Sequence, residues 1–263
     1  MTMFLKHIIY SMIMSHFGWV VHKLIGRADV ILEVLDARFI DETRNLDLEE
    51  QIKHYGKVLI HVINKCDFLE QDELEKLKKK FENCVFVSAK RHFGTKMLKE
   101  KIMILAKQHN KKQPVVGVIG YPNVGKSSVI NALSGSGSAR TSPEAGFTKG
   151  SQMVRISKDL MMIDSPGVIQ KEKQNEHDLA LIGAKNPSTI QNPDLAVIKL
   201  MKKYDSVIQN YYGVDVRANK EKTIEDIAIK MNLKKKGNIP DIDRASKMIL
   251  LDWQNGKIRK SLV

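Results

Sequence analysis

The chain has 263 residues, which is long enough to bury one full hydrophobic core and to carry a second, smaller domain. Its 43 Lys and Arg residues outnumber 30 Asp and Glu, and the net charge of +13 favours polyanionic partners, either nucleic acid or an anionic membrane surface. Neither cysteine, Cys66 or Cys84, belongs to a Cys-x-x-Cys or Cys/His cluster, which argues against a cysteine-bound metal and favours a reduced, cytoplasmic location.

The first apolar stretch, Ile8–Val21, is too short at about fourteen residues to cross a bilayer. It also lacks the small-residue cleavage site of a secretory signal. We therefore expect a helix that packs on the core, and we expect no membrane partner.

Five short β-branched apolar runs predict strands, and each run ends at a polar residue or a glycine. These runs lie at 30–35, 58–63, 85–87, 115–119 and 160–163, with a further strand at 153–156. Helical patterns lie between them, at about 46–55, 72–81, 96–107 and 126–133. Because strands that alternate with helices form a mainly parallel sheet covered on both faces, ligands are expected at the carboxyl ends of the strands.

A polar segment from about 108 to 114 ends in a proline and is interpreted as a linker between the two halves of one α/β domain, residues 1–177. Beyond Gly167 the pattern changes to helix-length segments, at 177–184, 194–212, 223–231 and 241–255. We therefore predict a small all-α domain over residues 178–263. Residues 199–263 hold 15 Lys or Arg against 8 Asp or Glu, so we expect a basic surface in this domain, which is compatible with RNA as a partner.

A glycine-rich loop, Gly120–Ser127, follows a predicted strand and begins a predicted helix, with the spacing G-x-x-x-x-G-K-S. In that context successive backbone N–H groups and the helix N-terminus bind the β-phosphate of a nucleotide. Lys126 is expected to bridge β- and γ-phosphate oxygens, and the Ser127 hydroxyl to ligate Mg²⁺. The nucleotide-binding residues assigned here are Tyr121, Pro122, Asn123, Val124, Gly125, Lys126, Ser127 and Ser128.

Two further segments complete the phosphate half of this site. Asp164 and Gly167 form a D-x-P-G sequence at the end of a strand, where the carboxylate can hold Mg²⁺ through water and the Gly167 N–H can reach the γ-phosphate. Thr148, in the stretch between, could complete the Mg²⁺ shell and respond to the γ-phosphate. We assign Lys126, Thr148 and Gly167 to catalysis, and Ser127, Thr148 and Asp164 to the metal.

Base selection is assigned to Asn64, Lys65 and Asp67, which form an N-K-x-D segment at the end of an apolar run. The Asp67 carboxylate can accept hydrogen bonds from guanine N1–H and the exocyclic amine, while Asn64 positions the ring edge and the Lys65 stem covers the base or sugar. Adenine lacks these donors, and a buried acceptor left unpaired gives discrimination of about 10⁴-fold.

The segment Ser88-Ala89-Lys90 follows the next predicted strand along the chain. From that position the Ala89 N–H could donate to guanine O6. We therefore include Ser88, Ala89 and Lys90 among the nucleotide-binding residues.

The N-K-x-D segment precedes the phosphate loop by about fifty residues, the reverse of the order in an unpermuted G domain. This inversion, with the succession N-K-x-D, S-A-K, phosphate loop, Thr and D-x-P-G, resembles the YlqF/YawG family of circularly permuted GTPases over nearly the whole chain. Asp36-Ala37-Arg38 and Arg44 resemble the family's D-A-R-x-P…R segment, although Ile40 stands where proline is usual. Ala145 likewise replaces the proline of the family's P-G-x-T.

The resemblance implies hydrolysis of GTP to GDP and phosphate, and a switch role in the assembly of the large ribosomal subunit, with that subunit or its rRNA as partner. The implied ligands are GTP or GDP and Mg²⁺, and Asn123 matches an asparagine with which potassium-stimulated relatives seat K⁺. Val168 stands where many GTPases have glutamine, so we expect slow intrinsic turnover that a partner or K⁺ stimulates. We expect a monomer and no DNA partner.

Two alternatives stay open at this point. The first is a nucleotide-gated binding module that regulates a protein partner, with hydrolysis incidental. The second is an ATP-using phosphotransferase, against which Asn64 and Asp67 argue because their donors and acceptors match guanine.

Overall fold

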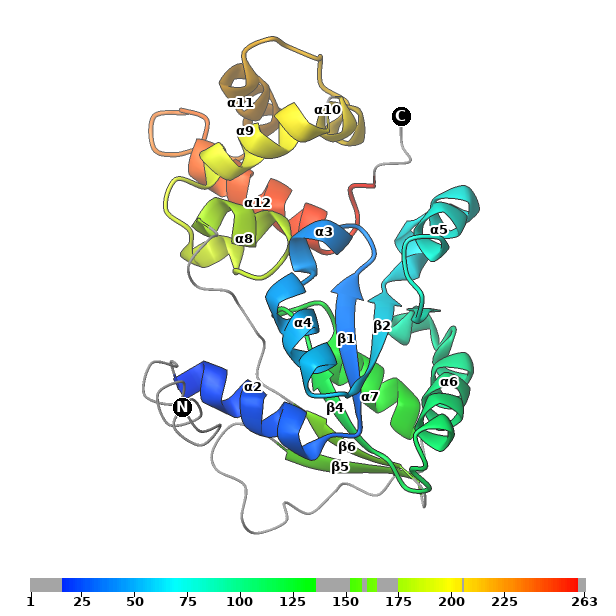
Figure 1. Cartoon of the computed structure of the whole chain (residues 1–263). Coiled ribbons are helices and arrows are strands. Elements are labelled where there is room, and N and C mark those ends of the chain that lie inside the picture. The colour runs from blue at the N-terminus through cyan, green and yellow to red at the C-terminus, as the bar shows by residue number, and fades with distance from the viewer. Residues whose placement is uncertain (1–15, 136–151, 158–159, 165–174, 205, 260–263) are drawn as a thin grey trace. The chain divides into compact units, whose positions relative to one another are not determined.

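The computed structural model describes residues 16–135, 152–157, 160–164, 175–204 and 206–259 (Figure 1). The chain divides into two compact units. One comprises the residues up to Asp67 and Gln71–Ile169, and the other comprises Phe68–Glu70 and the residues from Gln170 onward.

The first unit is built on a six-stranded sheet in the order β3-β2-β1-β4-β6-β5. Every neighbouring pair is parallel except β5 and β6, which are antiparallel. The predicted α/β fold with a mainly parallel sheet is therefore confirmed. The strands are β1 Val30–Asp36, β2 Val58–Asn64, β3 Cys84–Val87, β4 Val115–Ile119, β5 Gln152–Ser157 and β6 Leu160–Asp164.

Strand register aligns the carboxyl ends on which the predicted site depends. Asp36 of β1 lies opposite Asn64 of β2, and Asn64 lies opposite Val87 of β3. On the other side of β1, Val118 of β4 lies opposite Asp164 of β6. The loops that follow these strands therefore leave the sheet at one edge, where ligands bind in open parallel sheets.

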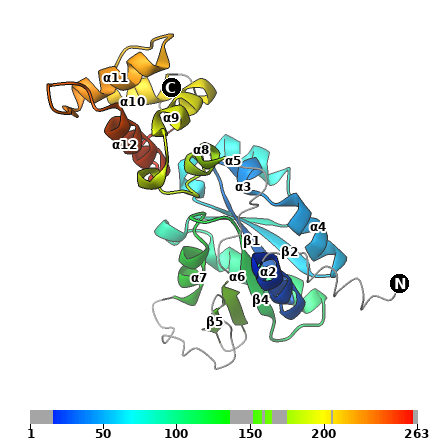
Figure 2. The same ribbon diagram turned by 90° about the vertical axis from the view of Figure 1, so that its left-hand side faces the viewer.

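Helices cover both faces of this sheet (Figure 2). One layer holds α2 His16–Arg27 and α4 Leu46–His54, and the other holds α6 Thr95–Gln108 and α7 Lys126–Ser134. The short α3 Ile40–Thr43 and α5 Gln71–Lys78 also belong to this unit.

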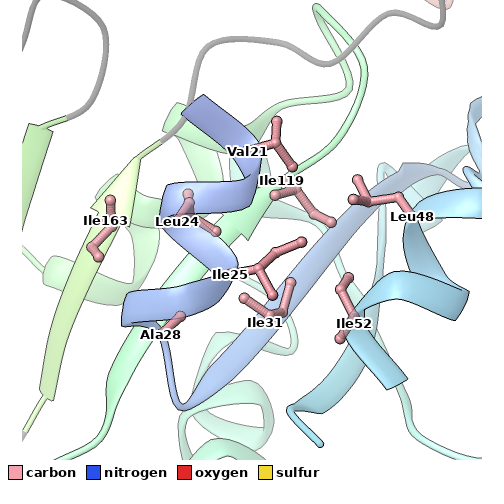
Figure 3. Close-up of a cluster of buried hydrophobic side chains, with 9 residues drawn as sticks. All are labelled: Val21, Leu24, Ile25, Ala28, Ile31, Leu48, Ile52, Ile119 and Ile163. Atoms are coloured by element: carbon pink, nitrogen blue, oxygen red, sulfur yellow. The ribbon is translucent and has the colours of Figure 1, made fainter. Parts of the chain in front are cut away.

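Helix α2 forms because its apolar residues recur every three or four positions and so make one stripe. Val21, Leu24 and Ile25 from that stripe join Ile31 of β1 and Ile52 of α4 in a buried cluster (Figure 3). Full burial of a side chain such as Ile25 stabilises the fold by roughly 2 kcal/mol. The sequence predicted a helix over 8–21. The described helix begins at His16 and continues to Arg27, and residues 8–15 lie outside the described part.

The second unit consists of helices around the buried Trp253, whose indole N–H donates to the Leu181 carbonyl at 2.9 Å. Its α-helices are α8 Glu176–Leu181, α9 Pro193–Lys203, α10 Val207–Tyr212, α11 Lys220–Lys230 and α12 Ile242–Gln254. Among the described residues, no helix combines the length and apolar character needed to span a bilayer.

The single helix predicted over 194–212 is wrong, because the chain breaks between α9 and α10. Tyr204 leaves the helical conformation with ψ 81°, and its ring packs on Trp253 with a centroid distance of 5.2 Å. Ser206 then takes φ 61°, which continues no right-handed helix. Tertiary packing of an aromatic side chain thus overrides the local helical pattern.

Candidate nucleotide site

The loop between β4 and α7 has the backbone geometry of a phosphate cradle. Gly120, Asn123 and Gly125 have positive φ values of 145°, 60° and 101°, and α7 begins directly after them at Lys126. The first N–H groups of a helix have no intrahelical acceptor, so they remain available to a bound anion. The side chain of Ser127 is exposed in this first turn, as an oxygen ligand for Mg²⁺ requires.

Lys126 lies buried against its own loop. Its ammonium group donates to the carbonyls of Gly120 at 3.1 Å and Tyr121 at 2.9 Å. Phosphate oxygens would offer this cation stronger, charged acceptors than neutral carbonyls do. The lysine is therefore held within the loop that the nucleotide would occupy.

Side-chain contacts join the N-K-x-D segment to this loop. The Asn64 amide donates from Nδ2 to the Val124 carbonyl at 2.8 Å, and Lys65 donates from Nζ to the Asn123 carbonyl at 2.8 Å. A Cβ atom on Gly125 would lie 2.3 Å from Asn64 Nδ2, so only glycine permits this approach. Residues separated by about sixty positions are thus brought to one edge of the sheet.

Asn64 and Ala89 use their polar groups within the protein. The Ala89 N–H, predicted to face guanine O6, donates to Asn64 Oδ1 at 3.2 Å. Because both ends of the buried Asn64 amide are bonded, Asn64 ties the phosphate loop to the S-A-K segment. This is a tethering role, which differs from the direct positioning of the ring edge that we expected.

The remaining residues that we predicted to select the base lie around the same loops. Asp67 follows β2 in a 3₁₀ turn, Cys66–Phe68, and its Oδ2 lies 3.4 Å from Arg91 Nε. Ser88 is buried, and its hydroxyl has no hydrogen-bond partner among the described residues, whereas Lys90 is exposed. Arg91 therefore provides the counter-charge of the Asp67 carboxylate, a contact that the sequence pattern did not indicate.

Asp36 also lies at this edge of the sheet, opposite Asn64. From the sequence, it was named only as part of the D-A-R segment that resembles the family. Its fully buried carboxylate accepts from Arg38 Nη2 at 2.8 Å and from Lys65 Nζ at 2.7 Å. Burial alone would raise the pKa of Asp36, but Arg38 and Lys65 outweigh it and hold that pKa below 3.8. Asp36 therefore anchors Lys65, the lysine expected to cover the base. An acidic residue at the carboxyl end of a strand beside the N-K-x-D strand was the available signal.

Of the three residues Thr148, Asp164 and Gly167, which we predicted to contact the phosphates or Mg²⁺, only Asp164 belongs to the described part of the chain. Thr148 and Gly167 lie outside the described residues. Asp164 is the last residue of β6, and its register partner in β4 is Val118. The phosphate loop begins two residues after Val118, at Gly120. The oxygen donors of Ser127, Asp164 and Thr148 suit Mg²⁺, and the exposed Ser127 at the start of α7 fits that assignment.

Comparisons with known proteins agree with this geometry. The model of a family described as 50S ribosome-binding GTPase matches residues 115–237 and therefore starts at β4, the strand that carries the phosphate loop. An uncharacterized GTP-binding protein of Methanocaldococcus jannaschii is 45% identical over 244 residues, which is 91% of this chain and 65% of that protein. Nuclear/nucleolar GTPase 2 of Arabidopsis thaliana is 31% identical over 90% of this chain and 43% of its own length.

Among solved structures, GNP-bound YlqF from T. maritima matches with a TM-score of 0.67 over 94% of this chain and 96% of that one, at 22% identity. The sheet order, the phosphate loop and the preceding N-K-x-D segment define a circularly permuted GTPase domain. Within that class the fold matches that of YlqF, in agreement with the resemblance of the motifs to the YlqF/YawG family. The chain spans less than two thirds of the length of the curated relatives given above.

Proposed function

We propose that this protein hydrolyses GTP to GDP and phosphate and acts as a GTP-dependent switch in large ribosomal subunit assembly. The observation that carries the first part is the pair of contacts from Asn64 and Lys65 to the Val124 and Asn123 carbonyls. They hold the guanine-selecting segment and the phosphate loop at one site. The family description and the nucleolar GTPase among the relatives support the second part.

In this proposal the N-K-x-D half selects the base. Asp67 accepts from guanine N1–H and the exocyclic amine, and Lys65 lies over the base while Asp36 holds its ammonium group. Arg91 is the group that the base displaces from Asp67, or that turns aside when the base binds.

The phosphate half neutralises and positions the triphosphate. Lys126 leaves the carbonyls of Gly120 and Tyr121 for β- and γ-phosphate oxygens, and the Gly167 N–H contacts the γ-phosphate. Ser127, Asp164 and Thr148 would hold Mg²⁺, which when bound neutralises charge on the phosphates.

The position that orients the attacking water in many GTPases lacks a suitable side chain here. Val168 follows Gly167 and has no side-chain amide that could orient a water molecule, so GTP hydrolysis by the isolated chain is slow. A ribosomal partner or K⁺, seated with the help of Asn123, supplies the missing stimulation.

The helical unit provides the surface for an RNA partner. A turn between α11 and α12 carries Lys234, Lys235 and Lys236, all exposed, and Lys235 N–H donates to the Ile239 carbonyl at 2.8 Å, which fixes the turn. Phosphate contacts from such lysines bind RNA without reading its sequence. We propose a cytoplasmic monomer that contacts rRNA in the large subunit through this unit, residues 178–263.

A protein partner is a second candidate, favoured by the apolar side chains around that turn. Ile229, Met231 and Ile239 are 53%, 45% and 60% exposed. Under this alternative the nucleotide gates binding to a protein and hydrolysis is incidental. Nucleotide-dependent binding that does not weaken with salt would favour the protein partner over RNA.

Base selection can be tested by changing the side chain at position 67 and the base of the nucleotide at the same time. The Asp67→Asn variant replaces a carboxylate acceptor by an amide that can donate to the 2-oxo group of xanthine. We expect GTP affinity to fall by about 100-fold or more, and XTP affinity to rise. Calorimetric titration of both nucleotides measures this.

The control is Asp72→Asn, because Asp72 is an exposed carboxylate of α5 whose side chain is 73% accessible. It should leave both affinities unchanged. Equal GTP affinity in Asp67→Asn and the unaltered chain would refute the guanine site.

A further inference from the structure

A cluster of polar side chains is buried between the sheet and helix α4, away from the nucleotide-site residues. Glu33 in the middle of β1 is 1% exposed, and its register partner in β2 is His61, which is 9% exposed. Paired residues of neighbouring strands point to the same face of a sheet. Glu49 reaches the cluster from α4, which packs on β2. Three elements thus direct ligand-type side chains to one place.

These groups lack the hydrogen bonds that burial demands. Glu33 Oε1 accepts from the Asn45 N–H at 3.0 Å. Within the described part of the chain, Glu33 Oε2 and both ring nitrogens of His61 have no hydrogen-bond partner. Buried polar atoms are nearly always satisfied, so Glu33 Oε2 and His61 Nε2, which lie 3.5 Å apart, point to a species bound between them, while water in the adjoining cavity can reach the other ring nitrogen.

The spacing of the atoms fits a metal ion better than direct hydrogen bonds. His61 Nε2 lies 3.5 Å from Glu33 Oε2 and 3.4 Å from Glu49 Oε2. Hydrogen bonds to oxygen are shorter, at about 2.9 Å. Ligands at about 2.1 Å from a tetrahedral ion lie about 3.4 Å from one another. The three ligand atoms all lie within 4.8 Å of each other.

We propose that Glu33, Glu49 and His61 bind one divalent transition-metal cation of the Zn²⁺ class. An imidazole with two carboxylates is a ligand set that suits Zn²⁺, whereas Mg²⁺ takes oxygen ligands in an octahedral arrangement. This ion is separate from the nucleotide-associated Mg²⁺.

The surroundings supply a fourth ligand and balance the charge. Glu49 and His61 line a cavity of about 620 Å³, so a water can complete the tetrahedron. Arg44 already neutralises Glu49, with its Nη2 2.7 Å from Oε2. Burial, followed by the charge of Glu49, raises the pKa of Glu33 to about 8.

Such an ion would tie α4 to β1 and β2. The carboxyl ends of these two strands carry Asp36 and Lys65, so the ion would support the elements from which the nucleotide site extends. Its role is structural and independent of the proposed hydrolysis.

The test uses the untagged full chain without nucleotide, in excess Mg²⁺, with Co²⁺ as the probe. We expect one equivalent of Co²⁺ to give the visible absorption of a tetrahedral site, without a thiolate charge-transfer band, and Zn²⁺ to displace it. Glu33→Gln and His61→Ala should each weaken Co²⁺ binding at least about tenfold. His109→Ala should not, because His109 lines the same cavity but does not belong to the ligand cluster.

X-ray absorption of the Zn²⁺-loaded, unaltered chain gives a second measurement that does not depend on the folding of any variant. One nitrogen and further oxygen ligands at about 2.0–2.1 Å are expected. Absence of the Co²⁺ band, sulfur in the ligand shell, or affinity unchanged in Glu33→Gln and His61→Ala would each overturn the proposal.

Discussion

Asp36 shows how a single buried carboxylate can hold two cationic side chains in place. It neutralises Arg38, whose side chain is 8% exposed, and it anchors the Lys65 ammonium group. Removing one partner of a buried ion pair is costly, so this anion stabilises both cations. Asp36 therefore connects the D-A-R sequence to the N-K-x-D segment physically, whereas the sequence related them only by family resemblance.

Replacing Asp36 by Asn should destabilise the fold by about 3 kcal/mol, because the buried Arg38 guanidinium then loses the carboxylate with which it is paired. GTP affinity should also fall, by about tenfold, since Lys65 loses a charged hydrogen bond. Chemical unfolding and nucleotide titration measure the two effects.

The pH dependence of the stability shows whether Asp36 acts through its charge or through the packing of its side chain. Its folded pKa lies below the ordinary 3.8, so its stabilising effect is complete above that value and is lost as the pH falls through the folded pKa. The stability difference between the unaltered chain and Asp36→Asn should therefore be constant above about pH 5 and shrink below about pH 4. A difference that persists unchanged in acid would show that charge is not the cause.

Gly125 permits a close approach between the phosphate loop and Asn64. An alanine methyl at this position would meet Asn64 Nδ2 at 2.3 Å, on a backbone with φ 101°. We expect Gly125→Ala to cost about 1–3 kcal/mol in stability and at least about tenfold in GTP affinity. Gly135→Ala is the matched control, because Gly135 also has positive φ, 66°, but has open space around its Cβ. If both variants bound GTP alike, the contact between Asn64 and the loop would be unimportant.

At the scale of elements, helix α2 stabilises the strand that carries the phosphate loop. Its apolar stripe packs with Ile31 of β1 and Ile119, the last residue of β4 (Figure 3). Truncating Ile25 to Ala should cost about 2–5 kcal/mol, because it leaves a cavity in a close-packed core. Thermal and urea unfolding measure this loss.

Ile104→Ala on α6 provides the comparison, because Ile104 is 56% exposed. Its effect should stay within about 0.5 kcal/mol. If Ile25→Ala lost no more stability than Ile104→Ala, α2 would contribute little to the core.

The strands and the edge at which the site lies could be predicted from the sequence, because β-branched runs that end in polar residues are local signals. The break at Tyr204 could not, since it depends on contact with Trp253 about fifty residues later. The tethering role of Asn64 also escaped prediction, because only the folded chain shows that Val124 and Ala89 use both ends of its amide. Glu33 gave no motif at all, and its partners come from α4 and β2.

At the scale of the whole molecule, the lysines in the turn between α11 and α12 allow RNA binding to be tested separately from nucleotide binding. Changing Lys234, Lys235 and Lys236 to Ala should weaken co-sedimentation with large ribosomal subunits and lower the log–log salt slope by about 2. Unchanged GTP binding would show that the nucleotide site is intact.

Lys78, Lys79 and Lys80 form the matched control, because they too are consecutive lysines, at the end of α5 in the other unit. Their replacement by Ala should leave co-sedimentation unaltered. An equal loss from both triples would indicate attraction by net charge alone, with no dedicated RNA surface.

The permuted order has a consequence during synthesis on the ribosome. Strands β1, β2 and β3 leave the exit tunnel first and can pair with one another, since their connections are short. Strand β4, the other neighbour of β1, follows only after the segment 108–114, and the phosphate loop comes last of all these parts. In the nascent chain, the strands that precede Asn64 and Ser88 can therefore pair before β4 and the phosphate loop have emerged.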